Sequence, residues 1–130
     1  MSDLRIVVYR STARHHLGEA GLRDILTVSR RNNGIEGVSG VLRNEDGQFV
    51  QALEGTPEAI AHLLRRIAVD PRHERFEIVV DRPIPERYFG DWTMADASSG
   101  TDDDDRLEIA FRHAPDDVRS AFGRTRGPAA

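Results

Sequence analysis

Apolar and polar positions alternate with the period of a β-strand in several separate stretches of the chain. In the first stretch, Leu4–Val8, apolar side chains occupy both faces, which is typical of a central strand that is covered on both sides. The glycine-rich stretch Gly37–Gly40 indicates close approach by another group. A turn signal ending in Asp46-Gly47 separates the second and third stretches. The predicted strands are residues 4–8, 37–42, 48–54 and 76–80, with a short fifth strand at 92–97.

A first helix is predicted over residues 19–33. Its apolar stripe passes through Ile25 and Leu26 and then reaches a polar residue, Ser29, at the next position of the stripe. Asn32-Asn33-Gly34 is expected to end this helix, because asparagine and glycine readily adopt the left-handed cap conformation.

A second helix is expected to begin at Thr56-Pro57, because threonine caps a helix and proline fits its first turn, and to end at Asp70-Pro71. Residues 81–90, rich in proline and charge, are expected to form a loop. Two shorter helices are predicted near the C-terminus, the first capped by one of residues 101–104. Their apolar stripes are Leu107, Ala110 and Phe111 in one helix and Val118, Ala121 and Phe122 in the other.

The predicted order β-α-β-β-α-β is the ferredoxin-like arrangement of the α+β class. It implies a mixed sheet with an added strand, two helices on one face, and two further C-terminal helices. We expect residues 1–97 to form the main domain, 98–124 a helical extension and 125–130 a disordered tail. A fold of this kind carries no function by itself.

Composition narrows the class of protein. The chain has 130 residues, enough for one domain, and it contains no cysteine, which excludes disulfides, thiol nucleophiles and cysteine zinc sites. There is no apolar run long enough to span a membrane and no secretion signal. The net charge of −4 comes from a mixture of both signs and does not favour binding to nucleic acid. A cytoplasmic globular protein is therefore expected.

Motifs for metal and hydrolytic chemistry are missing from the sequence. The aspartates at 102–105 lack the spacing of a calcium loop, and the five histidines do not fall at metal-binding intervals. The adjacent His15-His16 is expected to lie in a solvated loop. No nucleophile elbow or phosphate-binding glycine loop is present. We therefore predict no metal site and no enzymatic activity.

The informative residues are polar groups at positions where a core would take an apolar one. Tyr9 lies on the first strand, and Gln51 points with two large apolar neighbours on the third. If the two long helices lie side by side, these groups and Ser29, Asn32 and Asn33 would line a slot between them. Such a slot suits a planar heterocycle with carbonyl and N–H edges. Its apolar body would come from Ile25, Leu42, Phe49 and Ile67.

Each of these residues also has a purely structural interpretation. Tyr9 alone is typical of a half-buried core tyrosine, and the two asparagines alone are typical of a helix end. Gln51 is harder to explain in this way, because a buried amide must find partners. The residue types alone leave both interpretations open.

Taken together, the residues form a pattern that resembles the BLUF family of flavin-dependent blue-light sensors. The resemblance runs from about Leu4 to Ala97, with the matching stretches in the same order and at similar spacing. The stretches are VYRS at 8–11, SRRNN at 29–33, GVSGVL at 37–42, GQFVQALEG at 47–55, DPRH at 70–73, and Trp92 with Met94.

The resemblance implies a role for individual residues. Tyr9 matches the tyrosine that donates an electron and then a proton to the excited flavin, and Gln51 matches the glutamine that switches hydrogen bonds between them. Asn33 matches the amide at the carbonyl and N3 edge of the ring, while Trp92 and Met94 match the strand that reports the switched state. The predicted cofactor contacts are Tyr9, Ile25, Ser29, Asn32, Asn33, Leu42, Phe49, Gln51, Arg66, Ile67, Asp70, Arg72 and His73, with Arg66 near the ribityl-phosphate tail.

The implied function is that of a blue-light photoreceptor that binds FAD, or alternatively FMN or riboflavin, without a covalent bond. Light would leave the Gln51 amide rotated or tautomerised and shift the flavin absorption reversibly to the red. A short stand-alone member would pass this state to an unknown downstream protein or through a homo-oligomer, with a dimer favoured. The alternatives are a light-independent interaction module and a flavin redox enzyme.

Overall fold

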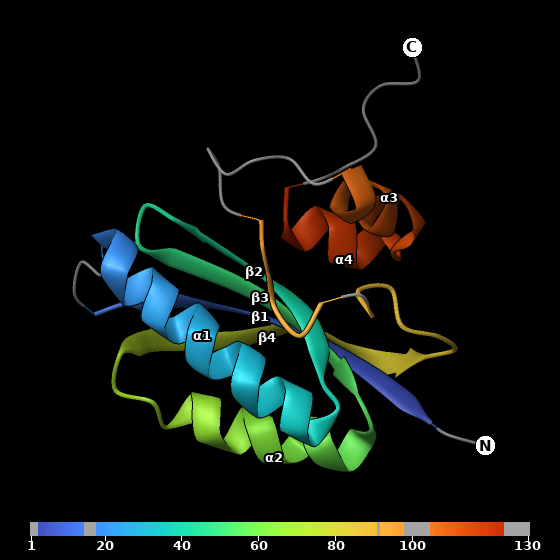
Figure 1. The fold of residues 1–130 in the computed structure, drawn as a ribbon, viewed down its shortest axis with the longest axis horizontal. Coiled ribbons are helices and arrows are strands. Elements are labelled where there is room, and N and C mark those ends of the chain that lie inside the picture. Colours follow the sequence, from blue (N-terminus) through green and yellow to red (C-terminus); the bar gives the residue numbers. More distant parts are fainter. Residues whose placement is uncertain (1–2, 15–17, 91, 98–104, 124–130) are drawn as a thin grey trace.

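The computed structural model describes residues 3–14, 18–90, 92–97 and 105–123. The predicted order of elements is confirmed (Figure 1). The elements are β1 (Leu4–Ala13), α1 (Gly18–Glu36), β2 (Ser39–Glu45), β3 (Gln48–Gly55), α2 (Pro57–Ala68), β4 (His73–Ile84), β5 (Ala95–Asp96), α3 (Asp105–His113) and α4 (Asp116–Ala121).

The five strands form one sheet in the order β4-β1-β3-β2-β5. The four longer strands pair antiparallel, whereas β5 runs parallel to β2 through Val41↔Ala95 and Leu42↔Asp96, so the sheet is mixed as predicted. The central pair is β1 with β3, and its register sets Tyr9 directly opposite Gln51. This arrangement matches the predicted ferredoxin-like α+β class.

Each face of the sheet has its own apolar cluster, because β1 is apolar on both sides. The α1/α2-side cluster includes Val7, Leu53 and Met94 from the strands and connections, together with the inward residues of the two long helices. The α3/α4-side cluster includes Ile6 and Val8 with the stripes of the two C-terminal helices. Figure 1 shows the two helix pairs on opposite sides of the sheet. The C-terminal helices therefore cover a face that the first two leave open.

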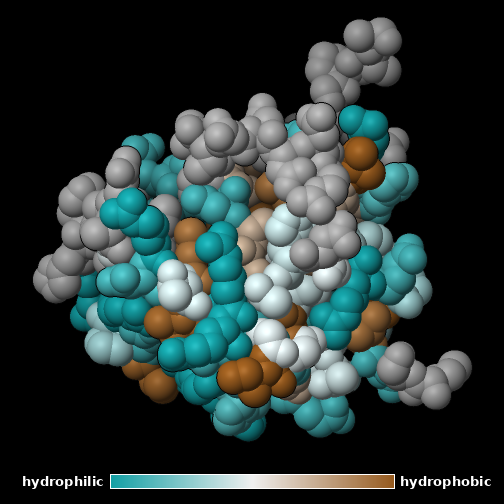
Figure 2. Space-filling model, in the orientation of Figure 1, coloured by the Kyte–Doolittle hydropathy of each residue, from teal (hydrophilic) through white to brown (hydrophobic). Residues whose placement is uncertain are grey.

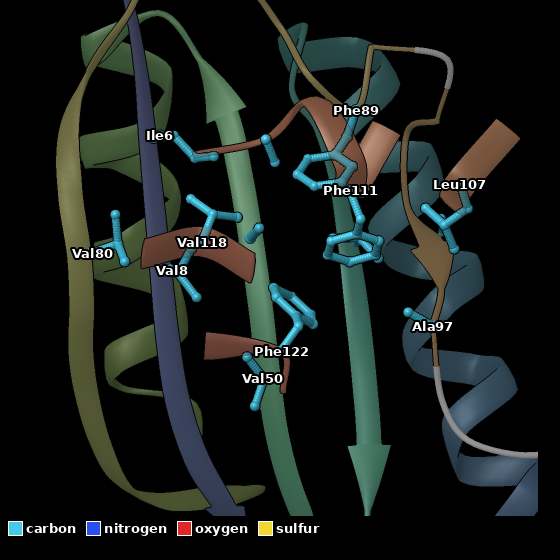
Figure 3. Packing of buried hydrophobic residues seen from close by; sticks show 14 of the residues in the cluster. Ile6, Val8, Val50, Val80, Phe89, Ala97, Leu107, Phe111, Val118 and Phe122 are labelled. Atoms are coloured by element: carbon cyan, nitrogen blue, oxygen red, sulfur yellow. The ribbon is translucent and has the colours of Figure 1, made fainter. Parts of the chain in front are cut away.

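Aromatic side chains fill the α3/α4-side cluster. Phe111 lies between Phe89 and Phe122, with ring centroids 5.1 Å and 5.2 Å away, in edge-to-face contacts (Figure 3). The predicted stripes of both helices are confirmed, since their main residues are buried here. Arg82 on β4 also holds α4 through an ion pair with Asp117 at 2.9 Å.

The opposite side of the molecule, which carries α1 and α2, is mainly hydrophilic and its apolar patches are separate (Figure 2). Two of its large apolar side chains are strongly exposed, Ile35 near the end of α1 and Val69 just after α2.

Several predicted element bounds are wrong. Strand β2 covers Ser39–Glu45 instead of 37–42, β4 begins at His73 instead of residue 76, β5 is limited to Ala95–Asp96, and α2 ends at Ala68, before Asp70-Pro71. The helix α1 does not end at Asn32-Asn33-Gly34 but continues to Glu36, because Gly37 takes the left-handed conformation (φ 71°) and the Val38 N–H bonds to the Asn33 carbonyl at 2.8 Å. The strand β1 continues beyond its predicted end at Val8. The expected loop at 81–90 begins later, because residues 81–84 extend β4.

Pro83 is compatible with this extension of β4 because the strand lies at one end of the sheet order. A proline that lacks an N–H is tolerated where a strand has one neighbour instead of two. The predicted start of α2 is confirmed, since the Thr56 hydroxyl accepts a hydrogen bond from the Ala59 N–H at 3.2 Å. The turn at Asp46-Gly47 is also confirmed, with φ of 53° and 78°.

Several expectations lie outside the described residues: the loop at His15-His16, the helix cap at 101–104 and the tail at 125–130. The boundaries 1–97, 98–124 and 125–130 stay predictions.

A fully buried carboxylate, Glu54 at the end of β3, connects the sheet to the loop after β4. It accepts hydrogen bonds from the backbone N–H groups of Tyr88 at 2.6 Å and Phe89 at 2.9 Å, and from the Ser39 hydroxyl at 3.0 Å. The Arg87 guanidinium donates to the Ser39 hydroxyl and to the Glu54 carbonyl. Burial raises the pKa of the Glu54 carboxyl, and the two backbone N–H groups oppose that rise.

Replacing Glu54 by glutamine should lower the free energy of unfolding by about 2 kcal/mol, because an amide NH₂ would face a buried backbone N–H that now has an acceptor. Urea denaturation measures this change. The same substitution at the exposed Glu58, in the first turn of α2, should cost no more than about 0.5 kcal/mol. Equal effects at the two positions would contradict the assigned role of Glu54.

Candidate functional site

A cavity of about 190 Å³ lies between the α1/α2 pair and the sheet. A water molecule needs roughly 15 Å³ by the same measure. The cavity is therefore large enough for a small organic ligand and not only for one or two water molecules. All predicted cofactor contacts line it: Tyr9, Ile25, Ser29, Asn32, Asn33, Leu42, Phe49, Gln51, Arg66, Ile67, Asp70, Arg72 and His73. Their role in binding flavin stays a prediction.

Four further lining residues are Ser11, Val28, Leu53 and Leu63, which the sequence analysis missed. Strand periodicity could have found two of them, because Ser11 follows Tyr9 by two positions and Leu53 follows Gln51 by two.

The wall that the sheet contributes contains a chain of hydrogen bonds. The Tyr9 hydroxyl donates to Gln51 Oε1 across the β1–β3 pair, and Gln51 Nε2 donates to Met94 Sδ at 3.4 Å. The exposed fractions of Tyr9, Gln51 and Met94 are 6%, 5% and 1%. The buried amide therefore has a partner at each end, as a buried polar group requires.

The Tyr9 phenol is held in the neutral form. Burial raises its pKa well above the ordinary range, the nearby Asp70 carboxylate adds to the rise, and the Arg72 guanidinium opposes it. The Phe76 ring packs against Tyr9 with centroids 4.9 Å apart. A neutral Tyr9 hydroxyl keeps its hydrogen and can donate the hydrogen bond to Gln51 Oε1.

The segment that follows the 85–90 loop is held through three successive backbone carbonyls. The Trp92 carbonyl accepts from the Gly40 N–H at 3.1 Å, that of Thr93 from Asn33 Nδ2 at 2.8 Å, and that of Met94 from Arg30 Nε at 2.9 Å. Asn33 lines the cavity as well, so it touches both the cavity and this segment.

Gly40 makes the close approach that was expected of this glycine-rich strand. A Cβ atom there would lie 2.2 Å from the Ala52 carbonyl oxygen and 3.3 Å from the Met94 methyl group. Any side chain at Gly40 would therefore displace β3 or the Met94 segment.

The two residues predicted to report the switched state lie in different places. Met94 packs in the α1/α2-side cluster and contacts Gln51. Trp92 is partly buried against the α3/α4-side cluster and does not line the cavity.

Two ion pairs lie at the part of the cavity formed by the C-terminal half of α2 and the connection after it. Arg72 binds Asp70 through Nη2 at 2.6 Å, and this contact holds the pKa of the Asp70 carboxyl below its ordinary value. Arg66 binds Glu36, the last residue of α1, at 2.5 Å. His73 is fixed by its Nε2, which lies 2.6 Å from the Ile67 carbonyl oxygen.

The donor and acceptor groups of the cavity fit a flat heterocycle. Ser11 and His73 belong to its lining, and Ser11 Oγ and His73 Nδ1 are buried without a hydrogen-bond partner among the described residues. The amides of Asn32, Asn33 and Gln51 offer donors and acceptors, and apolar residues of both helices and the sheet complete the walls. This combination matches the aromatic ring system of flavin, with its polar edge.

No group of three or more side chains able to hold a metal ion is found among the described residues. Over the same part of the chain, no helix is long and apolar enough to cross a membrane.

Comparison with known proteins finds a matching family and several similar relatives. Residues 4–95 match the profile of the family described as "Sensors of blue-light using FAD". A photoactivated adenylate cyclase subunit beta from Euglena gracilis is 34% identical over 98 residues, which are 75% of this chain but 11% of that protein. The chain thus spans about a tenth of the length of the curated relatives it matches.

Solved structures are similar too. BlrB, described as a BLUF protein in its dark state, is 36% identical with a TM-score of 0.71, covering 75% of this chain and 74% of that one. A bacterial light-regulated adenylyl cyclase is 29% identical with a TM-score of 0.73, covering 82% of this chain and 32% of that one.

The raised pKa of Tyr9 can be measured directly. In a Tyr88→Phe variant, Tyr9 is the remaining one of the chain's two tyrosines. With isotope-labelled tyrosine, carbon NMR should show a neutral phenol at about pH 10, where an unperturbed tyrosine is half ionised. The urea-unfolded variant serves as the control and should titrate near that value. A folded-state midpoint near it would contradict the burial of Tyr9.

Proposed function

The chain belongs to the BLUF family of flavin-binding blue-light sensors, and on that premise we propose that its light switch is the hydrogen-bonded set of Tyr9, Gln51 and Met94. The observation that carries this proposal is the bond from the Tyr9 hydroxyl to Gln51 Oε1 in the cavity wall. Relatives whose names describe them as photoactivated or light-regulated support a function in light sensing.

We propose FAD as the cofactor, with FMN and riboflavin as alternatives. When bound, flavin absorbs blue light and becomes a strong oxidant. Ile25, Leu42, Phe49 and Ile67 are the apolar residues that would pack on the ring. The polar edges of the ring system would be held by Asn32, Asn33, Arg72 and His73, with Ser29, Arg66 and Asp70 around them.

Tyr9 is the residue placed to lose an electron, because it is a buried phenol in the cavity wall. Its proton has an acceptor already in contact, Gln51 Oε1. The electron would go to the photoexcited flavin, the oxidant, and the proton would follow through Gln51, which accepts it at Oε1 and gives up one from Nε2. Return of the electron and a proton to Tyr9 would then leave the amide in a rotated or tautomeric form. Nε2 would then no longer donate to Met94 Sδ, and that contact would be lost.

Loss of the Met94 contact is the step that we propose carries the signal onward. Met94 precedes β5, and its neighbours Trp92 and Ala95 belong to the α3/α4-side cluster. A small shift of this segment would therefore reach α3 and α4, which provides the two-state element that a small change needs for amplification.

The receiver would be a downstream protein or a second copy of the chain, with a dimer favoured. The matched part of the chain is a sensor, and the cyclase relatives extend far beyond it. We propose that this protein has no enzymatic activity of its own and acts in the cytoplasm.

The absorption spectrum of the purified protein, in the dark and immediately after blue light, tests the function. A flavin spectrum that shifts to the red and relaxes in the dark is expected. A flavin spectrum that bleaches instead would indicate redox chemistry, and a protein that binds no added flavin would indicate a light-independent interaction module. Either of these outcomes would overturn the photoreceptor proposal.

Tyr9→Phe should retain flavin and lose the red shift, because the phenyl ring keeps the packing but has no proton to give to Gln51. The measurement is the light-minus-dark difference spectrum. Tyr88→Phe is the matched control, since it removes the other hydroxyl from a side chain that packs in the α3/α4-side cluster, and it should leave the shift intact. A normal photocycle in Tyr9→Phe would remove Tyr9 from the mechanism.

A further inference from the structure

The cavity contains an arginine whose partner comes from a different helix. Arg66 of α2 lines the cavity, and its Nη2 lies 2.5 Å from Oε1 of Glu36. The side chains are 43% and 22% exposed, so the pair sits where the cavity meets solvent. Glu36 itself is not part of the cavity lining.

The position of Arg66 differs from that of the polar groups expected at the ring. Asn33, Gln51 and Tyr9 are between 3% and 6% exposed, which marks the deep part of the cavity. A flavin with its ring edge at these groups would direct its ribityl chain toward solvent, where two exposed guanidinium groups line the cavity, Arg66 and Arg72, with side chains 43% and 55% exposed. The other lining guanidinium, Arg72, is already bound by Asp70 through several hydrogen bonds from its own connection.

A phosphate bound at Arg66 would compete with the Glu36 carboxylate for the same guanidinium group. A carboxylate and a phosphate seek the same guanidinium donors, and arginine pairs well with either. Glu36 is also the last residue of the 19-residue α1, whose C-terminal end carries partial negative charge. If a phosphate binds Arg66, Glu36 loses its ion-pair partner. Its carboxylate then remains beside the negative charge of the phosphate and the partial negative charge at the C-terminal end of α1.

We propose that Glu36 competes with the phosphate of a flavin nucleotide for Arg66 and thereby limits the preference of the site for FMN and FAD over riboflavin. The inference rests on the proposed flavin binding. Within it, Glu36 influences the relative affinities for the phosphorylated flavins and for riboflavin. Arg66 is the group that binds, and Glu36 is a specificity residue that acts through it.

The test is a titration of flavin-free protein with riboflavin, FMN and FAD, followed by flavin fluorescence. In Glu36→Gln, the Kd values for FMN and FAD should fall by about fivefold, the effect expected for release of one partly exposed ion pair. The Kd for riboflavin should change by less than about twofold, because riboflavin has no phosphate. In 1 M salt, where the Debye length is about 3 Å, the difference should shrink.

Three further variants locate the effect. Arg66→Met should weaken the binding of FMN and FAD selectively. Adding Glu36→Gln to it should then have a smaller effect than in the parent chain, because competition for the guanidinium is gone and only the repulsion between carboxylate and phosphate is relieved. Glu77→Gln breaks an exposed pair with Arg10 elsewhere and should leave all three affinities unchanged. Glu36→Asp keeps the charge but shortens the reach, and should shift the selectivity in the same direction as Glu36→Gln.

The outcomes separate the two proposals. If none of the three flavins binds, flavin binding itself fails. If the flavins bind but the ratio of riboflavin to FMN affinity is the same in the parent chain and in Glu36→Gln, the inference about Glu36 is overturned. The same holds if Glu36→Gln has an undiminished effect when Arg66 is methionine. Should Glu36→Gln fail to fold, Glu36→Asp decides the question by the same ratio.

Discussion

The buried amide of Gln51 is the constraint on which the site depends. An amide that is 5% exposed must have a hydrogen-bond partner at its oxygen and at its nitrogen. The β1–β3 register places Tyr9 opposite Gln51, so that the Tyr9 hydroxyl can donate to the amide oxygen. Gly40 has no side chain, which leaves room for Met94, the acceptor for the amide nitrogen. The same contacts that satisfy the amide connect the cavity to the segment before β5. The contacts that satisfy this buried amide are therefore the same ones that we propose light rearranges.

Both faces of the sheet are covered by helices, and the segment that contains Met94 contacts the apolar cluster on each face. Met94 belongs to the α1/α2-side cluster, whereas Trp92, Ala95 and Ala97 belong to the α3/α4-side cluster. One short segment thus contributes to both cores, and β5 fastens it to β2. Because packed cores resist gradual deformation, the proposed loss of the Met94 contact would displace the segment as a unit. The buried Glu54 network anchors the loop just before it.

Much of the cavity could be predicted from residue types at unexpected positions. Tyr9 and Gln51 stand on strands where apolar residues are usual, and the comparisons show that the chain belongs to the predicted family. Ser11 was missed because a serine on a strand is unremarkable until its burial without a partner is seen. Glu36 was missed for a different reason. It lies beyond the predicted end of the first helix, and its partner is 30 residues away.

The sequence by itself determined the order of elements, the turn at Asp46-Gly47, the threonine cap of α2 and the polar chemistry of the slot. These follow from local conformational preferences and from the periods of helix and strand, which neighbouring residues carry. Only the tertiary structure decided which face α3 and α4 cover, that Met94 rather than Trp92 meets Gln51, and which partners Glu54 and Arg66 take. Those features depend on contacts between residues far apart in the chain. The spacing of residues along the sequence does not show which distant side chains come into contact.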